Sequence, residues 1–235
     1  MDDHTGASRV PGALLGRGRA ADVYEYGDGR VLRRYRIERD HGIEAGVMAY
    51  LRANGYPVPE VFEAEGRDMV MERVEGPTML REMGRQPWRV RHFARMLADL
   101  HRRLHEFAPP PDLRESFGPR ETVLHLDLHP DNVLLTPSGP VVIDWSNAAA
   151  GAAGADIAQT LLIMAVSEAD VPTLLKPVLS VLRKMFVRTF VAAAQADPAP
   201  YLPAVGQARF ENPHLTPVET ERLGAFLEQV ERMSA

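Results

Sequence analysis

Cysteine is absent from this chain of 235 residues, and lysine is nearly absent. Without cysteine there can be no disulfide bond, thiolate nucleophile or cysteine ligand for zinc, so a metal ion can be held only by oxygen or imidazole groups. The two lysines, Lys176 and Lys184, lie in the last third of the sequence. A positively charged site in the first 175 residues must therefore be built from arginine or histidine.

Long apolar runs and an excess of basic residues are missing as well. The longest apolar run, residues 161–166, is far too short to span a bilayer, and the acidic, polar residues 1–4 do not resemble a secretory signal. The formal net charge of −5 provides no basic surface of the kind that nucleic-acid binding needs. We therefore expect a cytoplasmic protein with no nucleic-acid or membrane partner, in which the negative charge favours a cationic small molecule. The sequence indicates no particular oligomeric state.

The first third of the chain has the patterns of strands. Residues 14–36 alternate short apolar segments with glycine-containing turns, which predicts an antiparallel meander. Between residues 43 and 51 an apolar residue recurs every four positions, which predicts one face of a helix. Residues 58–63 and 69–74 predict two further strands around a polar turn.

The rest of the chain is predicted to be mainly helical. An amphipathic helix is expected over residues 93–107, a short hairpin over residues 133–143 and a last helix over residues 217–233. The chain is long enough for two small lobes with real cores. We therefore predict an α+β fold with an N-terminal lobe at residues 1–75 and a helical C-terminal lobe at residues 76–235.

Candidate chemistry lies in the polar segment His125–Asn132, HLDLHPDN, which precedes an apolar hairpin ending at Asp144. Phosphoryl transfer needs a carboxylate that receives the acceptor's hydroxyl proton and oxygen ligands that hold Mg²⁺ against the phosphates. Asp127 is the predicted catalytic base, and Asn132 and Asp144 are the predicted magnesium ligands. Their spacing resembles the protein-kinase pattern H-x-D-x-x-x-x-N followed by an aspartate after a hydrophobic strand. The alternative is a loop whose polar side chains merely form turns, which is the expected role of Asp131.

A glycine-rich turn near the N-terminus fits the register of a phosphate-covering loop. Its residues are Gly16, Gly18, Ala21 and Val23. Because their side chains are mostly small, backbone N–H groups near residues 18–21 can approach phosphates closely.

The charged strand that follows this turn carries the predicted phosphate-binding cation. Arg33 and Arg34 face opposite sides of the strand, so one of them can grip the α- and β-phosphates where kinases use lysine. We favour Arg33, with Glu44 on the next helix as its partner. The alternative is a solvated arginine pair at a strand edge.

The order of these segments is similar to that of the aminoglycoside phosphotransferase and choline kinase-like family over roughly residues 12–165, most specifically in HLDLHPDN and in the later IDW. The resemblance implies the bilobal protein-kinase-like fold, with a small antiparallel sheet and one helix in the N-lobe. By their position in this order, Glu72 and Val74 are expected at the hinge, where backbone groups would bind adenine. ATP or GTP with Mg²⁺ is implied as donor, and a hydroxyl of a small metabolite or an aminoglycoside-like antibiotic as acceptor. Asp156 resembles a family aspartate that braces the catalytic loop.

Two other functions stay open. A pseudokinase would bind nucleotide with weak turnover, because arginine stands where lysine is usual. His125, Asp127 and His129 also spell H-x-D-x-H, which fits a metal-dependent hydrolase, and His101 and His105 could add ligands. In the kinase interpretation, the first two histidines orient the loop by hydrogen bonds, and His101 and His105 lie on the exposed side of their helix.

Overall fold

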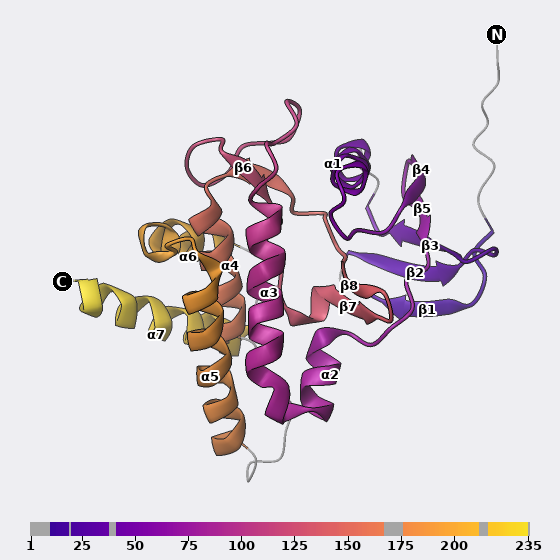
Figure 1. Ribbon diagram of the computed structural model, residues 1–235. Helices are drawn as coiled ribbons and strands as arrows, with labels where there is room; N and C mark the ends of the chain where they lie inside the picture. Colours follow the sequence, from indigo (N-terminus) through magenta and orange to yellow (C-terminus); the bar gives the residue numbers. More distant parts are fainter. Residues whose placement is uncertain (1–9, 19, 38–40, 167–175, 212–215, 235) are drawn as a thin grey trace. The chain divides into compact units, whose positions relative to one another are not determined.

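The computed structural model describes residues 10–18, 20–37, 41–166, 176–211 and 216–234. They belong to two compact units, residues 1–75 and 76–235. Figure 1 shows both units and labels helices α1–α7 and strands β1–β8.

The N-terminal unit is a five-stranded antiparallel sheet together with helix α1, Gly42–Ala53 (Figure 1). In space the strands follow the order β1-β2-β3-β5-β4, and their bounds are Leu14–Arg17 (β1), Ala21–Glu25 (β2), Arg30–Tyr35 (β3), Val61–Glu65 (β4) and Asp68–Glu72 (β5). The turn between β2 and β3 contains Gly27 and Gly29 with φ of 64° and 70°, a region that glycine adopts without steric cost. The predicted meander is confirmed.

Two details of this unit differ from the prediction. The last two strands are shifted by up to three residues, because Val58 is buried in the segment before β4 without belonging to a strand. On α1, Ile43 is 49% exposed and the neighbouring Glu44 is buried, since Glu44 pairs with groups of β3. An acidic residue thus occupies a place that apolar periodicity assigns to a hydrophobic one.

The C-terminal unit is mainly helical. Its α-helices are Met79–Arg85 (α2), Val90–Leu104 (α3), Ala153–Val166 (α4), Lys176–Ala194 (α5), Leu202–Phe210 (α6) and Pro217–Ser234 (α7), with short 3₁₀ turns at Pro87–Arg89, Pro130–Asn132 and Ala199–Tyr201. Two small antiparallel pairs join Thr122–Leu124 (β6) to Ala149–Gly151 (β9), and Val133–Thr136 (β7) to Gly139–Val142 (β8). Figure 1 shows α3 and α5 running side by side, in agreement with the contacts between them.

Helix α3 corrects one prediction. Its apolar residues Phe93, Leu97, Leu100 and Leu104 are buried as the periodicity predicts. His101 is also fully buried, and the side chain of His105 is only 7% exposed, so the expectation that both histidines lie on the exposed side is wrong. The reason is that α3 is covered on a second side, where Asp156 of α4 lies against both rings.

The core of the C-terminal unit lies around α4. The residues of this core are Leu124, Leu126, Ala149, Ala155, Ala158, Leu162, Val166, Leu202, Val205 and Leu223. This core anchors β6 and the start of the loop at residues 125–132, which carries the candidate chemistry. Within the described residues, no helix combines the length and apolarity that a membrane crossing requires.

Candidate active site

The loop at residues 125–132 begins with a strained backbone that Asp156 holds in place. Leu126 has a φ of 59°, and a non-glycine residue in this left-handed region costs on the order of 1–3 kcal/mol. The Leu126 N–H donates to Oδ1 of Asp156 at 2.7 Å, and the His125 N–H donates to Oδ2 at 3.2 Å. Asp156 is fully buried in the first turn of α4, so it braces the loop as the family resemblance implies.

His125 ties the loop to the end of the β7–β8 hairpin. Its Nδ1 accepts the N–H of Asp127 at 3.2 Å, and its Nε2 donates to the carbonyl of Ile143 at 3.1 Å. The ring packs on Trp145 with 4.5 Å between ring centroids. Burial lowers the pKa of His125, which favours this neutral ring. Both ring nitrogens are engaged, so His125 orients the loop by hydrogen bonds.

Asp127 and Asn132 lie together within the loop. Nδ2 of Asn132 donates to the carbonyl oxygen of Asp127 at 2.9 Å and to its Oδ2 at 3.2 Å. Nε2 of His129 lies 3.7 Å from Oδ1 of Asp127, and burial lowers the pKa of His129 to about 4, so this ring is neutral near pH 7. The exposed Asp131 donates its N–H to Nδ1 of His129 at 3.3 Å as part of the turn.

Asp144 follows β8 at the same end of the hairpin. The Ile143 N–H donates to the carbonyl of Asn132 at 3.0 Å, which brings Asn132 and Asp144 to neighbouring positions. Asp144 has a φ of 65°, and its Oδ1 accepts a hydrogen bond from Ser146 Oγ at 3.0 Å. The C-terminal unit therefore brings Asp127, Asn132 and Asp144 to one end of one hairpin.

This donor set fits Mg²⁺. The amide of Asn132 is fixed through Nδ2, which directs its carbonyl oxygen away from Asp127. That oxygen and the carboxylate of Asp144 are the hard ligands that Mg²⁺ prefers.

In the N-terminal unit, the two candidate arginines have different partners. Nη1 of Arg33 lies 3.2 Å from Oε1 of Glu44, and the Tyr35 hydroxyl donates to Oε2 of Glu44 at 2.8 Å. Arg33 and Glu44 are 9% and 6% exposed. Arg34 donates two hydrogen bonds to Asp68 in a bidentate ion pair, from Nε to Oδ1 and from Nη2 to Oδ2, both at 2.7 Å. The structure thus forms the Arg33–Glu44 pair, on the opposite side of β3 from Arg34.

The glycine-rich turn joins β1 to β2. Gly16 pairs with Val23, and the Gly18 N–H donates to the carbonyl of Ala21 at 2.8 Å. A Cβ on Gly18 would lie 2.8 Å from that oxygen, so glycine is required there by the close approach. Arg36 donates to the carbonyl of Gly18 at 3.1 Å and holds the turn from the other side.

The predicted hinge residues lie at and beyond the end of β5. Oε2 of Glu72 accepts hydrogen bonds from Nη1 of Arg52 and from the Glu60 N–H, both at 3.0 Å. Val74 lies two residues past the strand end.

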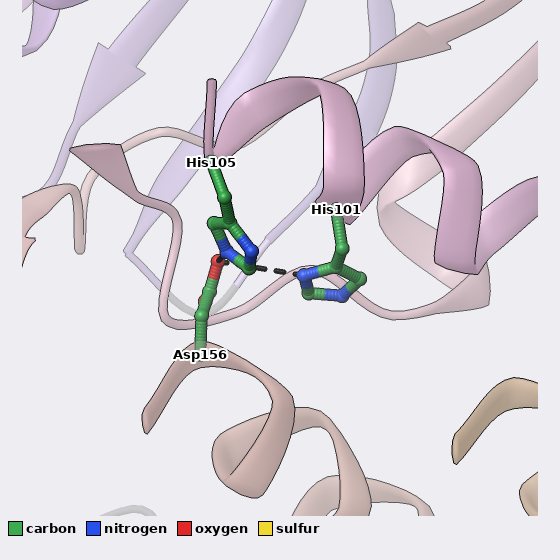
Figure 2. Close-up of side chains that lie close together, drawn as sticks. All are labelled: His101, His105 and Asp156. Atoms are coloured by element: carbon green, nitrogen blue, oxygen red, sulfur yellow. Dashed lines mark hydrogen bonds and ion pairs between the residues drawn. The ribbon is translucent and has the colours of Figure 1, made fainter. Parts of the chain in front are cut away.

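The predicted site did not include the polar residues around Asp156. His101 of α3, His105 just after α3 and Thr160 of α4 gather there, and Figure 2 shows the two rings turned toward the carboxylate. The sequence does contain a sign of this cluster: Leu97, His101 and His105 follow one another at intervals of four residues, which places them on one side of a helix.

The hydrolase interpretation is not supported by this geometry. His125 has both ring nitrogens in hydrogen bonds, so it has no lone pair for a metal ion. In the part of the chain that the structure describes, the metal-sized group of ligands is instead His101, His105 and Asp156.

Comparison with known protein families identifies the family of this chain. The model of the phosphotransferase enzyme family matches residues 12–121 and 112–194 of this chain. No curated protein matches it.

Solved kinase structures have the same fold. Choline kinase from Cryptosporidium parvum Iowa II is 15% identical, with 94% of this chain and 88% of that chain covered and a TM-score of 0.59. The protein chain of the streptomycin–ATP–APH(2")-IIa ternary complex is 13% identical to this chain, with 92% of this chain and 90% of that chain covered and a TM-score of 0.58. A choline/ethanolamine kinase family protein from Mesorhizobium loti is 15% identical, with 97% and 89% covered and a TM-score of 0.57. The predicted α+β protein-kinase-like fold is confirmed, and the chain belongs to the phosphotransferase enzyme family as a small-molecule kinase.

Proposed function

We propose that this kinase transfers the γ-phosphate of ATP to a hydroxyl group of a small molecule, with Asp127 as the catalytic base. The observation that carries the proposal is the pair of hydrogen bonds from Asn132 to Asp127, at 2.9 and 3.2 Å, next to the hairpin end that bears Asp144. Phosphoryl transfer depends chiefly on such positioning and on charge neutralisation.

In this mechanism Asp127 receives the proton of the acceptor hydroxyl as the oxygen attacks phosphorus. Asn132 holds the Asp127 carboxylate in one orientation through Nδ2. Asn132 and Asp144 would hold Mg²⁺, which neutralises the charge of the phosphates when it is bound. His129 beside Asp127 is neutral near pH 7, so its ring adds no positive charge next to the carboxylate.

The N-terminal unit would bind the nucleotide. Backbone N–H groups of the turn at residues 16–23 would approach the phosphates, and Arg33 would grip the α- and β-phosphates with its orientation fixed by Glu44. Backbone groups of Glu72 and Val74 would bind adenine.

The proposed acceptor is a cationic small alcohol, such as an amino alcohol or an aminoglycoside-like antibiotic. Two observations support this class. The chain carries a formal net charge of −5, and its structural neighbours include a choline kinase and a complex that contains streptomycin and ATP.

Transfer from radiolabelled ATP to a panel of aminoglycosides, choline and ethanolamine tests the proposal. Asp127→Asn should lower the rate by at least about 10²-fold, the usual scale for a lost general base, while Mg-ATP still raises the melting temperature. Asp131→Asn is the matched control, because Asp131 is an exposed aspartate of the same loop.

Equal rates for Asp127→Asn and the unmodified chain would contradict the role of Asp127. Arg33, which stands where kinases use lysine, favours a second candidate, a nucleotide-binding pseudokinase. That candidate predicts stabilisation by Mg-ATP, about 2.7 kcal/mol at a hundredfold excess over Kd, with transfer to no acceptor.

A further inference from the structure

Two histidines and one aspartate form a buried cluster, and its aspartate accepts hydrogen bonds from the start of the loop at residues 125–132; Figure 2 shows the three side chains. His101 lies in the last turn of α3, His105 directly follows the end of that helix, and Asp156 lies in the first turn of α4. Nδ1 of His101 is 3.4 Å and Nε2 of His105 is 3.1 Å from Oδ2 of Asp156. All three ligand atoms lie within 4.8 Å of one another.

The hydrogen bonds of Thr160 fix the proton position on His101. The Thr160 hydroxyl lies 2.8 Å from the carbonyl of Leu128 and 3.2 Å from that of Asp156, so its single proton goes to a backbone carbonyl. The same hydroxyl oxygen lies 3.1 Å from Nε2 of His101 and therefore accepts a proton from it. Nδ1 of a neutral His101 is then a lone pair that faces Asp156.

This arrangement calls for a positive charge between His101 and Asp156. Within the described residues, Nδ1 of His101 is buried without a hydrogen-bond partner, although Oδ2 of Asp156 lies 3.4 Å away. Either a proton on Nδ1 or a metal ion between the two atoms would satisfy both. Burial lowers the pKa of His101 despite the nearby carboxylate, which disfavours the protonated ring.

Asp156 is ionised, as a carboxylate ligand of a metal ion must be. Burial raises the pKa of Asp156, but hydrogen bonding to the carboxylate offsets this effect, and the pKa lies well below its usual value. The two N–H groups of the catalytic loop also stabilise the carboxylate.

We propose that His101, His105 and Asp156 form a binding site for Zn²⁺. Metal–ligand bonds of about 2.0–2.1 Å in a tetrahedron place neighbouring ligands about 3.3 Å apart, close to the 3.1 and 3.4 Å between each histidine nitrogen and Oδ2 of Asp156. With all three ligand atoms within 4.8 Å of one another, the two imidazole rings would move closer together when the ion binds. Two imidazole nitrogens with one carboxylate oxygen suit Zn²⁺ and not Mg²⁺. Thr160 supplies the outer hydrogen bond that fixes the orientation of a ligating histidine.

The ion would connect three segments of the C-terminal unit. Oδ1 of Asp156 keeps its hydrogen bond to Leu126 while Oδ2 binds the metal, so α3, α4 and the start of the catalytic loop become joined through one carboxylate. Zinc occupancy would therefore stiffen the loop from behind. The site is independent of the proposed phosphoryl transfer, because neither Asp127 nor a magnesium ligand takes part in it.

Zinc titration of the full chain tests the proposal. Protein freed of metal with a chelator is titrated with Zn²⁺ against a chromophoric competitor in magnesium-free buffer, and the Co²⁺ form is recorded by visible absorption. We expect one Zn²⁺ per chain and the intense absorption of tetrahedral Co²⁺. His105→Gln should weaken zinc binding by more than the roughly 10–100-fold that loss of an outer-shell partner costs.

Two further variants keep the test decisive. His92→Gln is the matched control, because His92 is an exposed histidine of α3, and it should bind zinc as the unmodified chain does. Thr160→Val removes the outer hydrogen bond and should weaken zinc binding by roughly 10–100-fold. Absence of a one-to-one zinc complex, or equal zinc affinity in His105→Gln and His92→Gln, would overturn the proposal in favour of a purely hydrogen-bonded brace.

Discussion

The two units stabilise their buried polar groups in different ways. In the N-terminal unit, two side chains of opposite charge form an ion pair, in which Arg33 lies 3.2 Å from Glu44. In the C-terminal unit, Asp156 is held by backbone N–H groups and by imidazole rings, one of which, His101, has its pKa lowered by burial. The first arrangement needs two residues that the sequence places 11 positions apart, whereas the second depends on α3, α4 and the loop together. Losing Asp156 should therefore disturb more of the molecule than losing the charge of Glu44.

Asp156→Ala should have the largest effect on stability. It leaves the N–H groups of His125 and Leu126 buried without acceptors, and it removes the support of the left-handed Leu126. Each unsatisfied buried donor costs about 1–3 kcal/mol, so we expect a loss of about 3–5 kcal/mol in the free energy of unfolding, measured by urea denaturation with chelator present.

Glu44→Gln is the comparison variant in the same assay. It keeps an acceptor for the Tyr35 hydroxyl and leaves the Arg33 charge at a position that is 9% exposed, so a loss of about 1–3 kcal/mol is expected. Asp131→Ala, at an exposed site, should change the free energy of unfolding by no more than about 0.5 kcal/mol. If Glu44→Gln proves more damaging than Asp156→Ala, the contrast between the two units is wrong.

The histidines of the C-terminal unit should make stability depend on pH. Burial lowers the pKa of His129 to about 4 and shifts those of His101 and His125 in the same direction. Below about pH 6.5 the unfolded chain binds protons that the folded chain does not, so the free energy of unfolding falls as the pH drops from about 6.5 to 4. His129 alone would account for up to about 3 kcal/mol, at 1.36 kcal/mol for each pKa unit.

Urea denaturation at several pH values between 7.5 and 4.5 measures this slope. His129→Gln should flatten part of it, while His92→Gln, at an exposed position, should leave it unchanged. The same slope in the unmodified chain and in His129→Gln would show that His129 binds protons equally in the folded and unfolded states.

Sequence patterns predicted the parts of the molecule that depend on local order. Strand alternation predicted that Arg33 and Arg34 face opposite sides of β3, and the kinase-like pattern of a strand cation with a glutamate on the next helix pointed to Arg33 and Glu44 as partners. The match to the protein-kinase pattern likewise grouped Asp127, Asn132 and Asp144, and the structure has them around one hairpin. Their roles in phosphoryl transfer stay predictions.

The errors arose where burial does not follow apolar periodicity. His101 and His105 count as polar in a periodicity analysis, and only the contact with Asp156, about 50 residues later, makes their burial favourable. Val58 is buried without being part of a strand, so its apolar character indicated packing and not pairing. Both cases need tertiary contacts that one sequence does not reveal.

The smallest effects that we predict concern two glycines of the N-terminal unit, one in a tight turn and one on an exposed helix surface. Gly18→Ala would place a Cβ 2.8 Å from the Ala21 carbonyl, so the turn must shift, with an expected loss of about 1 kcal/mol and a raised KM for ATP. Gly46→Ala, at an exposed position of α1 with nothing within 4 Å, should instead stabilise the protein by about 0.5–1 kcal/mol, because alanine favours helix. Urea denaturation measures both signs. A gain for Gly18→Ala would show that the turn can widen freely, and the close approach to Ala21 would then not explain why glycine is found there.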